Sequence, residues 1–245
     1  EQLIEGDQPI NRQFLELLVK ETGVNLNLAT SRVVSSGRAG GLSVVDLAFR
    51  FLAASDQPSV IVGGVDTFYD GHMLQLLHAN DRLLAGGNSD GFIPGEAAAF
   101  LLLSRDKIPF RDTGQLVSLC EPGLASEPGH RFSKEPYRGD GLAQALATAL
   151  ENAQTAKIKT LFSSMNGESF FAKEHGVAIV RNRPLLEEDI KIDHPADCFG
   201  DLGAAFAPVT VGLLAVYLTG RKLASPSVLC CSSDRESRAA MVVHV

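Results

Sequence analysis

The sequence predicts an α/β protein with a mixed sheet whose two faces are covered by helices. Short apolar runs alternate along the chain with longer segments of helical periodicity, and several of these runs are apolar enough to form buried strands. Of the 245 residues, 45% are hydrophobic and 21% are charged, which is ordinary for a folded protein large enough to bury a core. We place a boundary near Arg105, between an N-terminal half (1–105) and a C-terminal half (106–245).

The N-terminal half is expected to contain three helices and three strands. Apolar residues at helical spacing predict the helices Asn11–Lys20, Leu42–Ala54 and Gly71–Asn80. Apolar or β-branched runs predict the strands Ser31–Ser36, Ser59–Gly64 and Ala97–Leu103. The first strand leads through the small-residue turn Gly37–Gly41 into a buried helix. We expect Ser59–Gly64 to be fully buried, with its two glycines where another segment approaches closely.

The C-terminal half is expected to contain three helices and four strands. The predicted helices are Gly141–Ala153, Glu174–Val180 and Gly203–Thr219, and the predicted strands are Gln115–Cys120, Thr160–Ser164, Ser227–Ser232 and Ala239–Val245. The longest apolar stretch, Leu202–Leu218, is slightly short for a membrane span and holds Pro208. We therefore interpret it as a buried helix.

Composition excludes several function classes. The formal net charge of −7 has the wrong sign for a general nucleic-acid binder. The six histidines and four cysteines show no metal-binding spacing, and the adjacent Cys230 and Cys231 are poorly placed for a disulfide. With no signal-peptide pattern and with reduced thiols, we expect a cytoplasmic protein. Position 1 is Glu, so we expect the gene product to begin further upstream.

Several ordered motifs resemble one known family. They are Ser35–Gly41 (SSGRAGG), Val60–Asp66 (VIVGGVD), Asp90–Ala99 (DGFIPGEAAA), Asn166–Glu168 (NGE) and Phe199–Ala205 (FGDLGAA). In this order and spacing the chain resembles the β-ketoacyl synthases of the thiolase-like fold. The resemblance implies two similar halves, each with a mixed five-stranded-type sheet covered by helices. It also implies that the first half is truncated at its N-terminus, because only 37 residues precede Arg38.

The resemblance fails at the family's Cys–His–His active site. Counting back from Gly63, the position of the acylated cysteine holds Arg38, and the two histidine positions hold Asn166 and either Gly200 or Asp201. A guanidinium group stays protonated and offers no lone pair, so it cannot form a thioester. The glycine-rich loop that helps to form the family's oxyanion hole is here the charged segment Ser233–Glu236.

Two roles stay open for these residues. Arg38 would lie at a helix N-terminus, which repels a cation unless Asp66, Glu168 or a bound anion compensates for its charge. It either fills a retired site or anchors an anionic group. Asn166 and Glu168 either serve as an oxyanion donor and an acid or base, or form an ordinary turn. Further candidates for ligand binding, Ser36 and Phe199, flank the motifs.

Two functions fit this pattern. In the first, the chain is a non-catalytic subunit that resembles the chain-length-determining partners of ketosynthases in fatty acid or polyketide-type metabolism. In the second, it is an acyltransferase or decarboxylase with a rebuilt site acting on acyl-carrier-protein or CoA thioesters. By resemblance, we expect a homodimer or a heterodimer with a ketosynthase, paired through a strand near Ser59–Gly64. No cofactor, metal or nucleic-acid partner is implied.

Overall fold

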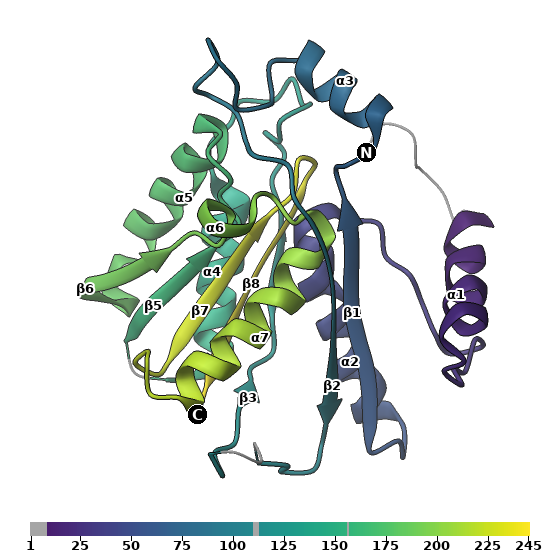
Figure 1. Ribbon diagram of the computed structural model, residues 1–245. Helices are drawn as coiled ribbons and strands as arrows, with labels where there is room; N and C mark the ends of the chain where they lie inside the picture. The colour runs from purple at the N-terminus through teal and green to yellow at the C-terminus, as the bar shows by residue number, and fades with distance from the viewer. Residues whose placement is uncertain (1–8, 110–112, 156) are drawn as a thin grey trace.

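The computed structural model describes residues 9–109, 113–155 and 157–245, and shows two sheets with two helices between them (Figure 1). Helices α2 (Gly40–Ala54) and α7 (Phe206–Thr219) form this central layer, because residues of both belong to one buried cluster with β1 of the first sheet and β5, β7 and β8 of the second. The α/β class and the thiolase-like layering expected from the sequence are confirmed.

The first sheet contains two antiparallel strands, β1 (Ser59–Thr67) and β2 (Glu96–Ser104), paired from Ser59 opposite Ser104 to Thr67 opposite Glu96. Exposed residues alternate with half-buried ones along most of β2, and Val62 is the one residue of β1 that is buried. The expectation of a strand buried throughout is therefore wrong. Helices α2 and α7 cover one face of this sheet, whereas its other face stays exposed.

The second sheet has six strands in the order β3-β8-β7-β5-β6, and β4 also pairs with β8. Their bounds are Ser118–Leu119 (β3), Gly123–Ser126 (β4), Ile158–Ser163 (β5), Leu186–Asp193 (β6), Ser227–Ser232 (β7) and Ser237–His244 (β8). The central layer covers one face, and α4 (Asp140–Ala153) and α5 (Ser169–Arg181) cover the other. Cys231 points into the first buried cluster and Cys230 into the second, so both thiols are buried.

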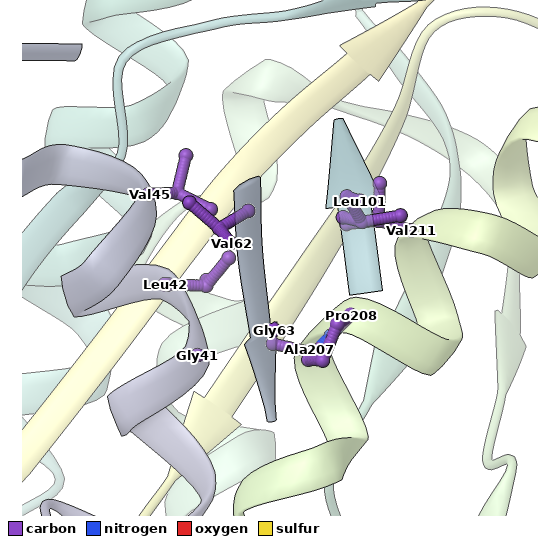
Figure 2. A pocket seen from close by; sticks show the side chains of 9 residues that line it. All are labelled: Gly41, Leu42, Val45, Val62, Gly63, Leu101, Ala207, Pro208 and Val211. Atoms are coloured by element: carbon purple, nitrogen blue, oxygen red, sulfur yellow. The ribbon is translucent and has the colours of Figure 1, made fainter. Parts of the chain in front are cut away.

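Close approach between the sheets and the central layer explains the glycine pairs. A Cβ atom at Gly64 would lie 2.3 Å from the carbonyl oxygen of Ala204, and one at Gly41 would lie 2.6 Å from Cβ of Ala207. These contacts bring α2, α7 and β1 together, and the cleft that they line leaves no room for a water molecule (Figure 2). The predicted close approach at the Gly-Gly segment is confirmed.

Three remaining helices lie outside these layers: α1 (Pro9–Thr22), α3 (Gly71–Ala79) and the short α6 (Ala196–Phe199). Short 3-10 turns occupy Gly37–Ala39, Arg183–Leu185 and Gly203–Ala205. The predicted strand Ser31–Ser36 is wrong, because this segment forms no ladder with the described residues and leads directly into the first 3-10 turn. Within the described ranges, no helix is both long enough and apolar enough to cross a membrane.

Candidate functional site: a buried ion-pair network

Arg38 lies in the turn that precedes α2, where the family resemblance places its cysteine. Its neighbour Gly37 has a φ of +61°, a conformation that glycine adopts easily, and Arg38 itself is only 4% exposed. The Ser233 hydroxyl holds this turn from the opposite side. It donates a hydrogen bond to the carbonyl oxygen of Ser36 at 2.5 Å and accepts one from the amide of Ala39 at 3.0 Å. The turn is thus fixed to the loop between β7 and β8.

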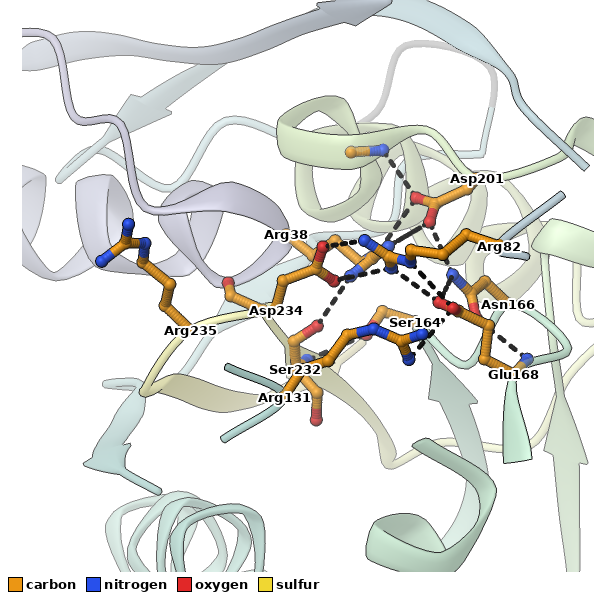
Figure 3. A network of polar contacts seen from close by, with 12 residues as sticks. Arg38, Arg82, Arg131, Ser164, Asn166, Glu168, Asp201, Ser232, Asp234 and Arg235 are labelled. Atoms are coloured by element: carbon orange, nitrogen blue, oxygen red, sulfur yellow. Dashed lines mark hydrogen bonds and ion pairs between the residues drawn. The ribbon is translucent and has the colours of Figure 1, made fainter. Parts of the chain in front are cut away.

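Two carboxylates neutralise the Arg38 guanidinium. Its Nε lies 2.9 and 3.0 Å from the two oxygens of Asp201, its Nη2 also bonds Asp201, and its Nη1 lies 2.8 Å from Oδ1 of Asp234 (Figure 3). Burial alone would lower the pKa of Arg38, but the two carboxylates outweigh it and raise the pKa well above its usual value. The compensating charges are therefore Asp201 and Asp234, and not Asp66, which instead accepts a hydrogen bond from the amide of Ala204 at 2.8 Å.

A second buried arginine, Arg82, extends the network. Its guanidinium forms two bonds with Glu168, at 2.9 and 2.8 Å, and a bond of 2.6 Å with Oδ2 of Asp234. Burial acts against the charge, but hydrogen bonds to Glu168 and Asp234 raise the pKa of Arg82 above its usual value. Asp234 is shared by Arg38 and Arg82, which lower its pKa despite burial. The half-buried Arg131 adds a third cation, 3.0 Å from Oε1 of Glu168.

Asn166 donates hydrogen bonds to both Glu168 and Asp201, two carboxylates that bind different arginines. Its side-chain amide nitrogen lies 3.1 Å from Oε2 of Glu168 and 2.8 Å from Oδ2 of Asp201. Its amide oxygen accepts a hydrogen bond from the backbone of Glu168 at 3.2 Å. An Asn in this loop after β5 therefore serves as a donor between two anions.

The structure brings together four of the candidates named from the sequence, namely Arg38, Asn166, Glu168 and Asp201. Gly200 has no side chain to contribute, and its φ of +71° sets the backbone that carries Asp201 into the site. Ser36 contributes its carbonyl oxygen to the turn. Phe199 is 49% exposed at the end of α6, away from the network.

Sequence reasoning missed Arg82 and Arg131. Both lie in irregular segments, where no periodicity indicates the direction of a side chain. The charged character of Ser233–Glu236 was visible in the sequence, but its pairing with Arg38 was not. Charge balance is the one signal that could have pointed to these partners, because a buried arginine needs carboxylates nearby.

The DGFIPGE motif supports this site through the Asp90 carboxylate, the Phe92 ring and the Gly95 amide. Asp90 accepts hydrogen bonds from the amide and hydroxyl of Ser169 at 2.6 and 2.8 Å, which lower its pKa and fix the start of α5. The Phe92 ring is buried, and the Arg82 guanidinium lies 5.3 Å from its centroid. The Gly95 amide donates to the carbonyl oxygen of Asp201 at 3.0 Å.

The printed contacts join three guanidinium groups (Arg38, Arg82 and Arg131) with three carboxylates (Glu168, Asp201 and Asp234), so the formal charges of these six side chains cancel. Glu168, Asp201 and Asp234 each bind at least one arginine and a second donor. The oxygens of these carboxylates are occupied by guanidinium and amide donors, so none of the three side chains is free to contact a substrate. The arrangement therefore suits the fixing of loops against one another better than it suits proton transfer.

Known proteins resemble this chain in fold over nearly its whole length and in sequence over one part of it. Residues 26–107 match the family described as "Beta-ketoacyl synthase, N-terminal domain". A search of curated protein sequences gave no match.

Solved structures extend the likeness over nearly the whole chain. A ketosynthase in complex with its chain length factor, from Xenorhabdus doucetiae, has a TM-score of 0.75 at 15% identity, covering 96% of this chain and 71% of that chain. The ishigamide ketosynthase/chain length factor has a TM-score of 0.71 at 14% identity, covering 98% and 73%. A type II polyketide synthase acyl-carrier protein in complex with its ketosynthase has a TM-score of 0.73 at 15% identity, covering 94% of this chain and 66% of that chain. This chain thus spans about two thirds to three quarters of the length of these three. Residues 26–107 carry the N-terminal domain signature of the β-ketoacyl synthases, and the chain has the thiolase-like fold of that family.

Proposed function

We propose that this chain is a non-catalytic β-ketoacyl synthase-like subunit of fatty acid or polyketide-type biosynthesis, which assembles with a ketosynthase as a chain length factor does. One observation carries the proposal: Asp201 and Asp234 bind the guanidinium of Arg38, the residue that the resemblance places at the family's acylated cysteine. A permanently protonated group cannot attack a thioester carbonyl.

The thiols of the chain do not replace the missing nucleophile. Burial raises the pKa of Cys230 to about 12 and raises that of Cys231 well above its usual value. Burial also raises the pKa of Cys120. A thiol must ionise to act as a nucleophile, so these three cysteines are poorly suited to the task. The fourth, Cys198, is exposed on α6, outside the network.

The cleft beside α2, the helix that follows Arg38, offers no space for an acyl chain. Residues of α2, β1, β2 and α7 meet directly in the cleft of Figure 2, which does not admit water. A chain carried by this protein would have to displace packed side chains such as Leu42 and Val211. This supports a role in which the acyl intermediate is held by a partner, or between the partner and this chain.

Likeness to two structures that contain a chain length factor supports the partner class. In both, that factor is paired with a ketosynthase, and we propose the same pairing here. Acyl carrier protein would then bind to the complex. This chain would help to shape the site in the complex that holds the acyl intermediate. The alternative, an acyltransferase or decarboxylase with a rebuilt site, would need Glu168 or Asn166 to be free of the bonds that now hold both.

Turnover and binding together test the proposal. The chain is incubated with malonyl- and acyl-carrier protein, and then with the corresponding CoA thioesters, and the products are followed by mass spectrometry. We expect no decarboxylation and no acyl transfer by the chain alone, and we expect a stable complex with a ketosynthase encoded beside it. Turnover that Asn166→Ala abolishes would overturn the proposal in favour of the rebuilt enzyme. Absence of a complex, measured by analytical ultracentrifugation, would overturn the partner role.

A further inference from the structure

A second cleft, separate from that of Figure 2, opens at the edge of the second sheet. It has a volume of about 480 Å³ and lies between the strands β5 and β6 and the loop that follows α7. It shares no residue with the arginine network, so the proposed function gives it no role. We call it the β6 cleft, and its polar lining residues are Lys159, Thr160, Glu187, Asp189, Lys191 and Lys222.

The cleft lies where β6 extends the sheet beyond the helix that covers the neighbouring strands. Leu186 and Ile192 of β6 pack in the second buried cluster, beneath α4 and α5. Side chains alternate along a strand, so Glu187, Asp189 and Lys191 face the opposite side of the sheet, where α7 lies. The first buried cluster joins α7 to β5, β7 and β8 but contains no described residue of β6, which is the edge strand in Figure 1. The polar face of β6 is therefore open to a ligand.

The charged groups around the β6 cleft are not paired with one another. The Lys191 ammonium lies 3.1 Å from Asp193, and the Lys222 ammonium lies 6.0 Å from the centroid of the Tyr217 ring. Within the part of the chain that the structure describes, no ion pair joins Lys159, Lys191 or Lys222 to either carboxylate of the cleft. An ammonium group has three donors, so Lys191 keeps donors for a ligand despite its contact with Asp193. Cations and anions thus face the same space with hydrogen-bonding capacity to spare.

Protection of the sheet edge explains only part of this arrangement. Charged residues on an exposed edge strand prevent pairing with another sheet, and β6 fits that description. Edge protection does not require Lys159 of β5 or Lys222 of the loop after α7, which reach the same cleft from two other elements. Pockets that bind small molecules have volumes of about 300 to 1,000 Å³ and a few convergent polar groups. The size of the cleft and the convergence of three segments on it therefore favour a binding site.

We propose that the β6 cleft binds a phosphate monoester that also carries hydroxyl groups, such as a sugar phosphate. The lysine ammonium groups hold the phosphate as compact positive charges. The Glu187 and Asp189 carboxylates accept hydrogen bonds from the hydroxyl groups. Phosphate alone would meet both carboxylates as repelling charges, so the mixed lining favours a ligand that has both kinds of group. The site is independent of the proposed ketosynthase partnership, and the failure of either proposal leaves the other standing.

Calorimetric titration of the full chain with ribose 5-phosphate tests the site. Lys159→Gln and Lys222→Gln each remove one ammonium group, and each should raise the dissociation constant about tenfold because a hydrogen bond to a charged group is lost. Lys173→Gln is the matched control, because Lys173 is exposed on α5, outside the cleft. Circular dichroism checks that each variant is folded. Absence of saturable binding by the wild-type chain, or an equal loss of affinity in the control, would overturn the proposal.

Inorganic phosphate distinguishes a sugar phosphate site from general attraction of anions. The double variant Glu187→Ala/Asp189→Ala removes both carboxylates, so inorganic phosphate should bind to it at least as tightly as to the wild-type chain. Ribose 5-phosphate loses the acceptors for its hydroxyl groups, so its preference over inorganic phosphate should fall about tenfold. If the wild-type chain has no such preference, or if the double variant keeps it in full, the proposal is wrong.

Discussion

The two sheets contain strands of nearly the same apolar character but bury them differently. In the first, β1 begins SVIVGG and has one buried residue, Val62; in the second, β7 reads SVLCCS and all six of its residues are buried. The strand sequences do not cause this difference. It follows from the number of layers, because α4 and α5 cover the far side of the second sheet and no described element covers the far side of the first. Burial of a strand thus depends on how many layers cover the sheet. Mutations at matched positions of the two sheets should therefore differ in their effect on stability.

The largest difference in lost unfolding free energy is expected between a mutation that breaks a buried ion pair and one that breaks an exposed ion pair. Arg238 of β8 and Glu174 of α5 are both fully buried, with Nε and Oε1 2.5 Å apart. Arg238→Met leaves a buried carboxylate without its partner, and we expect the free energy of unfolding to fall by about 3 to 5 kcal/mol. The pair of Arg181 with Asp140, at 2.7 Å and with both side chains about half exposed, is the control, where Arg181→Met should cost less than about 1 kcal/mol. Urea unfolding measures both, and equal losses would contradict the comparison.

Truncation of leucines in the two sheets gives the next effect. Leu229 of β7 is fully buried, so Leu229→Ala should lower the free energy of unfolding by about 2 to 5 kcal/mol through lost contacts and a cavity. Leu102→Ala on the open face of β2 should lower it by less than about 0.5 kcal/mol in the monomer. A loss at Leu102 as large as that at Leu229, measured below the concentration at which copies associate, would show that the outer face is covered within one chain.

The dependence of stability on pH should show a third and smaller effect of burial. Burial on α5, with a minor contribution from His194, lowers the pKa of His175 to about 4 from 6.5. The unfolded chain therefore binds a proton between these pH values while the folded chain does not, so stability falls as pH falls from 6.5 to 4. The full shift corresponds to about 3 kcal/mol, and partial exposure to solvent reduces it. His175→Leu should flatten the dependence of the unfolding free energy on pH over this range, as measured by urea unfolding at several pH values.

Most of the fold could be predicted from the sequence, because periodicity and apolar runs are local. The helices containing Leu42–Ala54 and Gly203–Thr219 and the strand Ser227–Ser232 are all present. Strand β6 was missed since LEEDIKID has four acidic residues and alternates only weakly. A strand at Ser31–Ser36 was predicted wrongly because a strand needs a neighbour to pair with, and local composition does not show whether one is present.

The candidate site could be predicted only in part. Arg38, Asn166 and Asp201 were found by counting from motifs, which works where spacing is kept. Asp234, which binds Arg38, is also bound by Arg82, a residue 152 positions away, and no local pattern joins two such positions. Their meeting depends on tertiary packing around the turn at Arg38, which the sequence alone does not describe.

The most direct measurement is the mass of the intact chain after incubation with acyl- and malonyl-carrier protein. A Cys198→Ser variant is run in parallel, so that acylation of the exposed thiol is recognised as adventitious. Because Asp201 and Asp234 bind Arg38, which we propose stands in place of the family's cysteine, we predict that the mass of the variant is unchanged. An acyl adduct on the variant that maps to a residue of the network would contradict the account.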